Sequence, residues 1–255
     1  MTVLPPMKHQ EISVIVPCYR EETVIQSNIL ALSSYLTSHF VTFEIICVTD
    51  GSPDGTVLQL QSLGHKHPEI PLTLISFKQN QGKGAAVKEG VLVAHYDPVL
   101  FIDADLTIPI EELDKFMLAL ETSDIAIASR LAPGATFEES APWYRTALAR
   151  GFHLLQMLLL GNFEYSDTQC GFKLFRKTTA RELFTRSRVK RFAFDAELLF
   201  LAKKLGHSVA ILPVTIKKDY RDSNVHVIRD PFNMLFALIK IRLNVWLGVY
   251  HLPKS

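Results

Sequence analysis

The stretch Val99-Leu100-Phe101-Ile102-Asp103-Ala104-Asp105 indicates the fold, because four apolar residues run directly into two aspartates. A short apolar run that ends at polar residues is typical of a buried strand. Further runs of this kind, separated by segments with helical periodicity, lie at 12–17, 43–48, 72–77 and 125–129. Strands that alternate with helices predict an α/β fold, with a mostly parallel sheet and helices on both faces.

The second half of the chain is less regular, but it contains no linker, repeat or low-complexity run. Its patterns predict helices at 142–160, 194–205 and 231–249, and strands at 171–175 and 209–214. We therefore expect a single domain over residues 1–255 with an elaborated C-terminal half.

The composition is that of an ordinary folded protein, with 48% apolar and 21% charged residues among 255. Lys and Arg number 27 against 26 Asp and Glu, which leaves a net charge of +1. A chain this balanced gives no overall reason to expect nucleic-acid binding, so any anionic partner must be held by local clusters. Three cysteines are too few for a disulfide framework and indicate reduced thiols in a cytoplasmic protein.

One stretch, 231–250, is long enough to cross a membrane. It carries Lys240 and Arg242 near its middle, and such central charges cost about 2.5–3.5 kcal/mol each on insertion scales. We therefore expect a buried or interfacial helix there instead of a spanning one. The N-terminal residues 1–11 lack the apolar core of a signal peptide.

Four polar motifs follow the first four predicted strands. In an open parallel sheet, ligands bind beyond these carboxyl ends, so the motifs should meet at one edge. They are Pro17-Cys18-Tyr19-Arg20-Glu21-Glu22, Asp50-Gly51-Ser52, Asn80-Gln81-Gly82-Lys83-Gly84 and Asp103-Ala104-Asp105. Each motif alone could be a simple turn, but four of them on one edge indicate a binding site.

Asp103 and Asp105 are two positions apart, so in an extended segment they point to the same side. Two such carboxylates repel each other unless a cation joins them. Hard oxygen ligands suit Mg²⁺ or Mn²⁺, which also bind substrate phosphates, so a diphosphate is the natural partner. The alternative is a turn with a helix cap. Lys83 lies in a glycine-flanked loop at the start of a helix, without the spacing of a P-loop.

Taken in order, these motifs resemble the family 2 glycosyltransferases of the GT-A (Rossmann-like) fold. Two later motifs, Asp167-Thr168-Gln169-Cys170-Gly171-Phe172-Lys173 and Phe194-Asp195-Ala196-Glu197-Leu198, are similar to the polyprenyl-phosphate branch of that family, which glucosylates or mannosylates dolichyl phosphate. The resemblance covers residues 12–250. It implies a nucleotide-binding half at about 10–130, an acceptor half at about 131–255, and an inverting transfer.

The resemblance also implies roles for individual residues. It implies a sugar-nucleotide site with Asp103 and Asp105 on the metal, Arg130 on the phosphates and Gln169 near the sugar; the remaining donor-site residues are Pro17, Tyr19, Glu21, Val48, Asp50, Lys83 and the backbone of Ala104. The chain departs from the family pattern at Thr49 and Arg20. It also lacks a phosphate-binding lysine near 222–224, where Arg221, with Arg229 or His226 as alternatives, would substitute.

A polyprenyl phosphate is already anionic at pH 7, because its second pKa is about 6. Such an acceptor needs cations to hold it more than it needs a general base. The sequence offers basic residues between the two later motifs, which could equally form a solvated face: Lys173, Arg176, Lys177, Arg181, Arg186, Arg188, Lys190 and Arg191. Asp167 and Asp195 are the carboxylates expected to orient the acceptor or act as base, with helix capping as the alternative.

The helices expected at 142–160 and 231–249 combine an apolar face with basic residues, which suits a membrane surface as well as a protein core. The leading hypothesis is a peripherally membrane-associated enzyme that transfers glucose from UDP-glucose to polyprenyl or dolichyl phosphate. The alternatives are GDP-mannose as donor, a soluble hydroxyl acceptor, or a non-catalytic protein that binds a sugar nucleotide.

Overall fold

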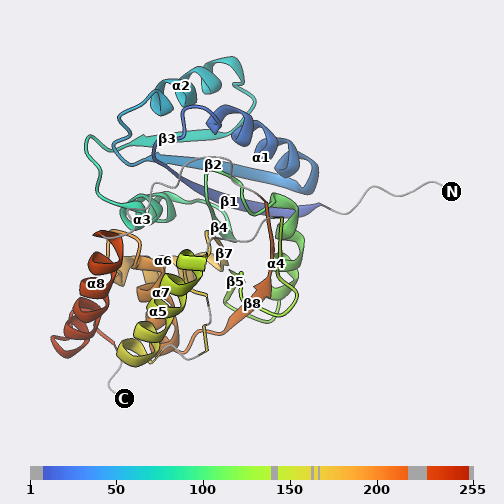
Figure 1. The fold of residues 1–255 in the computed structure, drawn as a ribbon. Coiled ribbons are helices and arrows are strands. Elements are labelled where there is room, and N and C mark those ends of the chain that lie inside the picture. Colours follow the sequence, from blue (N-terminus) through green and yellow to red (C-terminus); the bar gives the residue numbers. More distant parts are fainter. Residues whose placement is uncertain (1–7, 139–142, 162–163, 166, 218–228, 253–255) are drawn as a thin grey trace.

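The structure is a computed structural model that describes residues 8–138, 143–161, 164–165, 167–217 and 229–252. Within these residues a mixed sheet has the strand order β3-β2-β1-β4-β7-β5-β8 (Figure 1). Its strands are β1 (His9–Cys18), β2 (Phe40–Thr49), β3 (Leu72–Ser76), β4 (Val99–Ile102), β5 (Ile125–Ser129), β7 (Phe172–Phe175) and β8 (Val209–Pro213). A separate short ladder pairs β6 (Thr136–Phe137) with β9 (Thr215–Ile216).

Side chains that point alternately to the two faces of the sheet form two hydrophobic cores, one on each face. Val14 and Val16 belong to one core and Ile15 to the other, because successive side chains of a strand point to opposite faces. Both faces are covered, and for this reason the strands are continuous apolar runs.

Helices cover both faces of the sheet (Figure 1). The first core lies under α1 (Ile25–His39), α2 (Thr56–Lys66) and α4 (Leu113–Leu120), the last preceded by the 3-10 turn η1 (Ile110–Glu112). The second core lies under α3 (Lys83–Val93), α6 (Lys177–Arg186) and α7 (Phe194–Leu205). Outside them, α8 (Arg229–Trp246) packs against α7 and against α5 (Trp143–Leu160).

The predicted α/β fold and its mostly parallel sheet are confirmed, and each strand predicted from the sequence is present. The sequence did not predict helix α6, the short ladder of β6 and β9, or the direction of β7, which runs antiparallel to both β4 and β5. Strand β5 lies between β7 and β8, so the two expected halves of the chain share one sheet. The division of function between those halves stays a prediction.

The direction of β7 decides which residues meet at the binding edge of the sheet. The strand order reverses at β1, which lies between β2 and β4, and ligands bind beyond the carboxyl ends of strands at such a point. Since β7 runs antiparallel, the residues before it, 167–171, reach the edge where β4 ends. We call this edge the rim.

Candidate active site

Asp50, directly after β2, organises the loop in front of α3. Its buried carboxylate accepts hydrogen bonds from the backbone N–H groups of Gln81 (2.6 Å) and Gly82 (2.8 Å). Burial raises its pKa above the ordinary value, although those N–H groups and the charge of Arg191 act in the opposite direction. Gly82 has a φ of +110°, a conformation that favours glycine. Asp50 therefore fixes the loop that delivers Lys83 to the rim.

Lys83, the first residue of α3, forms an ion pair with Asp103, the first residue after β4. The distance from Lys83 Nζ to Asp103 Oδ1 is 2.6 Å, and the two side chains are 23% and 29% exposed. Burial lowers the pKa of Lys83, but the charges of Asp103, Asp195 and Asp105 raise it further, so the net shift is upward. Lys83 is therefore a cation held among aspartates at the rim.

Burial alternates along Asp103-Ala104-Asp105, but the segment is a turn and not the extended segment that the sequence predicted, since the carbonyl of Asp103 accepts the N–H of Leu106 at 3.1 Å. Ala104 is buried in the first core, and its carbonyl accepts a hydrogen bond from Asn28 Nδ2 at 2.8 Å. Asp103 and Asp105 stay partly exposed, and Asp105 Oδ1 accepts the N–H of Thr107 at 3.0 Å. Both carboxylates therefore lie outside the core, at the rim.

The carboxylate ligands available at the rim suit a hard divalent cation. Within the described part of the chain, no group of three or more His, Cys, Asp or Glu residues could hold a metal by itself. Two carboxylates are nevertheless the usual protein contribution to a Mg²⁺ site, where water and substrate phosphates complete the coordination. Asp103 and Asp105 fit such a shared site.

Asp167 and Arg130 form a second unit at the rim. Asp167 accepts a forked pair of hydrogen bonds from Arg130, Nε to Oδ2 at 2.7 Å and Nη2 to Oδ1 at 2.9 Å, and also the backbone N–H of Arg130. Burial alone would raise the pKa of Asp167, but Arg130 lowers it below the ordinary value. A carboxylate held this way is ionised and orients the guanidinium.

Asp195, in the first turn of α7, pairs with Lys173 of β7. The distance from Lys173 Nζ to Asp195 Oδ1 is 2.6 Å, and both side chains are almost completely buried. Lys173 also donates to the carbonyl of Cys170 at 2.6 Å. Burial raises the pKa of Asp195, against the charges of Lys173 and Lys83. This pair joins α7 to the residues that precede β7.

The remaining expected donor residues divide between the rim and the core. Pro17 near the end of β1, and Tyr19 and Glu21 after it, are partly exposed. Val48 is fully buried in the second core beneath α3, so its side chain belongs to the core. Gln169 is partly exposed and donates to Thr168. The expected phosphate ligand Arg221 lies outside the described residues.

The basic residues between the two later motifs do not gather in one place. Arg176 donates to the carbonyls of Leu120 and Ser123, while Lys177 and Arg181 donate to carbonyls near the end of α3. These contacts lie at the edge opposite the rim, because α3 begins at the rim and β7 runs away from it. Among that set, Lys173 lies in the rim network, and the segment 188–191 lies beside the loop before α3.

Gly171 is a functional position that residue chemistry alone did not single out. A Cβ added there would collide with the carboxylate of Asp103, and its carbonyl accepts the N–H of Asp103 at 3.0 Å. Only glycine leaves room for that carboxylate. A glycine inside a strand-like pattern is the available sequence signal, since it often marks a close approach.

Known proteins are similar to this chain in sequence. The family model described as "Glycosyl transferase family 2" matches residues 13–184. A Drosophila melanogaster protein named "Dolichyl-phosphate beta-glucosyltransferase" is 40% identical over 208 residues, which cover 76% of this chain and 63% of the relative. Proteins of the same name from Dictyostelium discoideum and Saccharomyces cerevisiae are 31% and 30% identical, covering 96% and 94% of this chain and 78% and 76% of theirs.

Solved structures agree with the fold. The glucosyl-3-phosphoglycerate synthase from Mycobacterium tuberculosis in complex with uridine-diphosphate is 20% identical, with a TM-score of 0.64 over 96% of this chain and 82% of that one. The family match covers more than half of the chain and includes Asp50, Lys83, Asp103 and Asp105. This chain therefore belongs to glycosyl transferase family 2 and is a glycosyltransferase of the GT-A fold.

Proposed function

We propose that the protein transfers glucose from UDP-glucose to dolichyl or another polyprenyl phosphate at a membrane surface. The observation that carries this proposal is the set of partly exposed charges at the rim, where the cations Lys83 and Arg130 lie with the carboxylates of Asp103 and Asp105. Such an array suits two phosphorylated substrates side by side. The names of the relatives point to glucose and to dolichyl phosphate.

The donor would lie against the loops after β1, β2 and β4. Asp103 and Asp105 would hold Mg²⁺ or Mn²⁺, whose chemistry is to offset the charge that grows on the leaving diphosphate. Lys83 and Arg130 supply fixed positive charge for the same phosphates. Asp50 keeps the Gln81–Gly82 backbone in place below them.

The acceptor phosphate is its own nucleophile, since it is anionic at pH 7. Its oxygen would attack the anomeric carbon from the face opposite the diphosphate, which inverts the configuration. Asp167 then serves to orient Arg130, because Arg130 occupies both of its oxygens. Asp195 serves to hold Lys173, because a buried ion pair has no open path to a substrate proton. Both aspartates are thus proposed as positioning residues.

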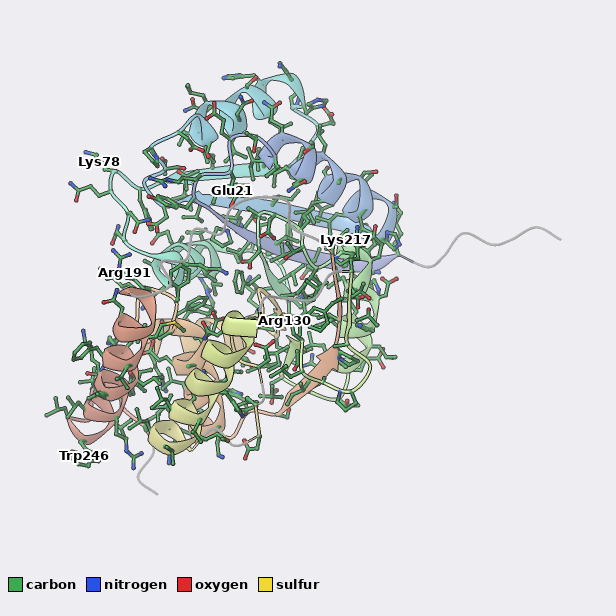
Figure 2. All side chains as sticks on the ribbon, in the orientation of Figure 1. Glu21, Lys78, Arg130, Arg191, Lys217 and Trp246 are labelled. Carbon is green, nitrogen blue, oxygen red and sulfur yellow. The ribbon has the colours of Figure 1, made fainter. Side chains whose placement is uncertain are left out.

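An exposed apolar stripe on α8 suits a membrane surface. Phe236, Ile239, Leu243 and Trp246 recur at helical spacing and are exposed, and the exposed Leu247 follows directly after the helix. Figure 2 shows Trp246 at the outer end of α8. The neighbouring Lys240 and Arg242 are also exposed and would attract anionic lipid. None of the helices in the described part of the chain is long and apolar enough to cross a bilayer.

The transfer is tested with labelled sugar nucleotides and polyprenyl phosphate, followed by extraction of the lipid. Label should enter the lipid phase from UDP-glucose in the presence of Mg²⁺ or Mn²⁺. Transfer from GDP-mannose alone would identify the rival donor. Transfer only to a soluble hydroxyl compound would overturn the lipid acceptor.

The membrane surface is tested by sedimentation with anionic liposomes. Trp246→Ser with Leu247→Ser should weaken binding at least about a hundredfold, because two large side chains lose about 3–5 kcal/mol of apolar burial in the lipid. The matched control is Leu58→Ser with Leu118→Ser, at positions equally exposed on α2 and α4. Equal losses in both double variants would remove α8 as the membrane contact.

A further inference from the structure

A buried glutamate, Glu197, lies where three separate parts of the second half meet. Its side chain is in the first turn of α7 and is fully buried. It accepts the backbone N–H groups of Arg188 (3.0 Å) and Val189 (2.9 Å), and the hydroxyl of Tyr250 at 2.6 Å. Burial raises the pKa of Glu197, while these donors favour the ionised form. The partners come from two segments, 188–189 and the residues after α8, so Glu197 ties both segments to α7.

The segment held by Glu197, Arg188–Arg191, braces the loop in front of α3. The carbonyl of Lys190 accepts the N–H of Ala85 at 3.0 Å, and Arg191 Nη1 donates to Asn80 Oδ1 at 3.2 Å. A Cβ added at Gly82 would collide with that same carbonyl. Figure 2 shows Arg191 on the same side of the molecule as Lys78, near this loop. The segment therefore backs the loop that Asp50 holds from the other side.

The third partner, Tyr250, brings in the C-terminal helix. Tyr250 follows the end of α8 by four residues and is 1% exposed, although α8 itself carries the exposed apolar stripe. Asn244 of α8 donates to the Tyr250 hydroxyl at 3.3 Å. A continuous chain of hydrogen bonds therefore runs from α8 through Tyr250 and Glu197 to the segment 188–191.

We infer that Glu197 and Tyr250 are positioning residues for the nucleotide: they set the loop Asn80–Lys83 through the segment Arg188–Arg191, so that the seating of α8 controls donor affinity. The inference rests on the proposed function in one respect only, namely that Lys83, the last residue of this loop, contacts the phosphates of the nucleotide. It gives α8 a second role beside its membrane contact.

The test uses Tyr250→Phe, which removes one hydroxyl and keeps the ring. UDP affinity is measured calorimetrically in the presence of Mn²⁺, without any acceptor. The Kd for UDP should rise about threefold to tenfold, a part of the value of one hydrogen bond to a charged group. The KM for UDP-glucose should rise by the same factor, with kcat changed less. Hydrogen exchange should accelerate at 188–191 and 80–85.

The matched control is Tyr35→Phe. Tyr35 donates its hydroxyl to Asp114 at 2.7 Å between α1 and α4, so it loses a similar hydrogen bond far from the loop. Its UDP affinity should stay unchanged. A second variant, Glu197→Gln, places an amide where an acceptor is required and should exceed Tyr250→Phe in effect, whereas Glu197→Asp should recover part of the affinity.

The inference is overturned if folded Tyr250→Phe binds UDP as tightly as the parent with unchanged exchange at 188–191. It is also overturned if Tyr35→Phe weakens UDP equally. Because UDP binding is measured without lipid, these results are separate from a failure of the proposed lipid transfer, which leaves UDP binding intact.

Discussion

Two lysine–aspartate pairs with the same Nζ–Oδ1 distance of 2.6 Å lie at the rim, and they differ in exposure. In the Lys83–Asp103 pair about a quarter of each side chain is open to solvent, whereas in the Lys173–Asp195 pair both are almost completely buried. Solvent and substrate can compete for the first pair. The second pair has no such exchange partner, so its role is to hold β7 and α7 in register. The same pair geometry therefore serves substrate binding at Lys83–Asp103 and structural support at Lys173–Asp195.

Breaking the buried pair should give the largest effect. Lys173→Met leaves Asp195 charged and unpaired in the core, which should cost about 3–5 kcal/mol in the free energy of unfolding. Chemical denaturation measures this. The double variant Lys173→Met with Asp195→Leu should regain most of the loss, since it removes both charges. If the double variant is as unstable as the single one, the lost stability comes from packing and not from the unpaired charge.

Removing a rim carboxylate should affect chemistry and leave folding intact. Asp105→Ala removes one of the two proposed metal ligands and should lower the transfer rate at least about a hundredfold, or about 2.7 kcal/mol. The free energy of unfolding should change by less than about 1 kcal/mol, because the side chain is partly exposed. A chelator should inhibit the parent enzyme to a similar degree. Full activity of Asp105→Ala would remove the metal assignment.

The Arg130–Asp167 pair is intermediate in burial, since the side chain of Arg130 is 40% exposed and that of Asp167 is 5% exposed. Its contribution to stability should depend on pH. Asp167→Asn should cost about 1.5–3 kcal/mol of stability at pH 7. The pKa of Asp167 is lowered in the folded state, so its contribution is present above about pH 4 and is lost as the pH falls through the folded pKa. The stability difference between parent and variant should therefore narrow below pH 4. A difference that stays constant down to pH 2 would contradict this pairing.

The partly exposed lysine, Lys83, should give the smallest change in stability. Lys83→Met should alter the free energy of unfolding by less than about 1 kcal/mol, because a partly exposed ion pair contributes little. Its Kd for UDP should nevertheless rise. A loss of stability equal to that of Lys173→Met would show that exposure does not distinguish the two pairs.

Much of the rim could be predicted from the sequence because β4 and β5 are unambiguous. The apolar run Val99–Ile102 predicts a strand, and the strand places Asp103 at its end without further information. Lys83 likewise follows from a helix start after a glycine-flanked loop. These predictions depend only on local patterns, which tertiary contacts did not override.

The partners of the later residues could not be predicted, because they depend on strand direction. A four-residue strand such as β7 carries no sequence signal for running antiparallel. Lys173 and Arg176 are three residues apart, about 10 Å along an extended chain. Lys173 therefore joins the rim network, whereas Arg176 makes its contacts at the opposite edge of the sheet. A run of basic residues therefore suggested one phosphate site where the fold makes several separate contacts.

The reversed direction of β7 also determines how this enzyme can be recombined with its relatives. A parallel strand brings the residues that follow it to the rim, whereas β7 brings those that precede it, 167–171. The hydrogen bond between Asp103 N and the carbonyl of Gly171 thus joins an outgoing chain to an incoming one, nearly seventy positions apart. A chimaera that exchanges residues after β5 would separate Asp103 from the glycine that accommodates it. A crossover after Phe175 keeps both from the same parent.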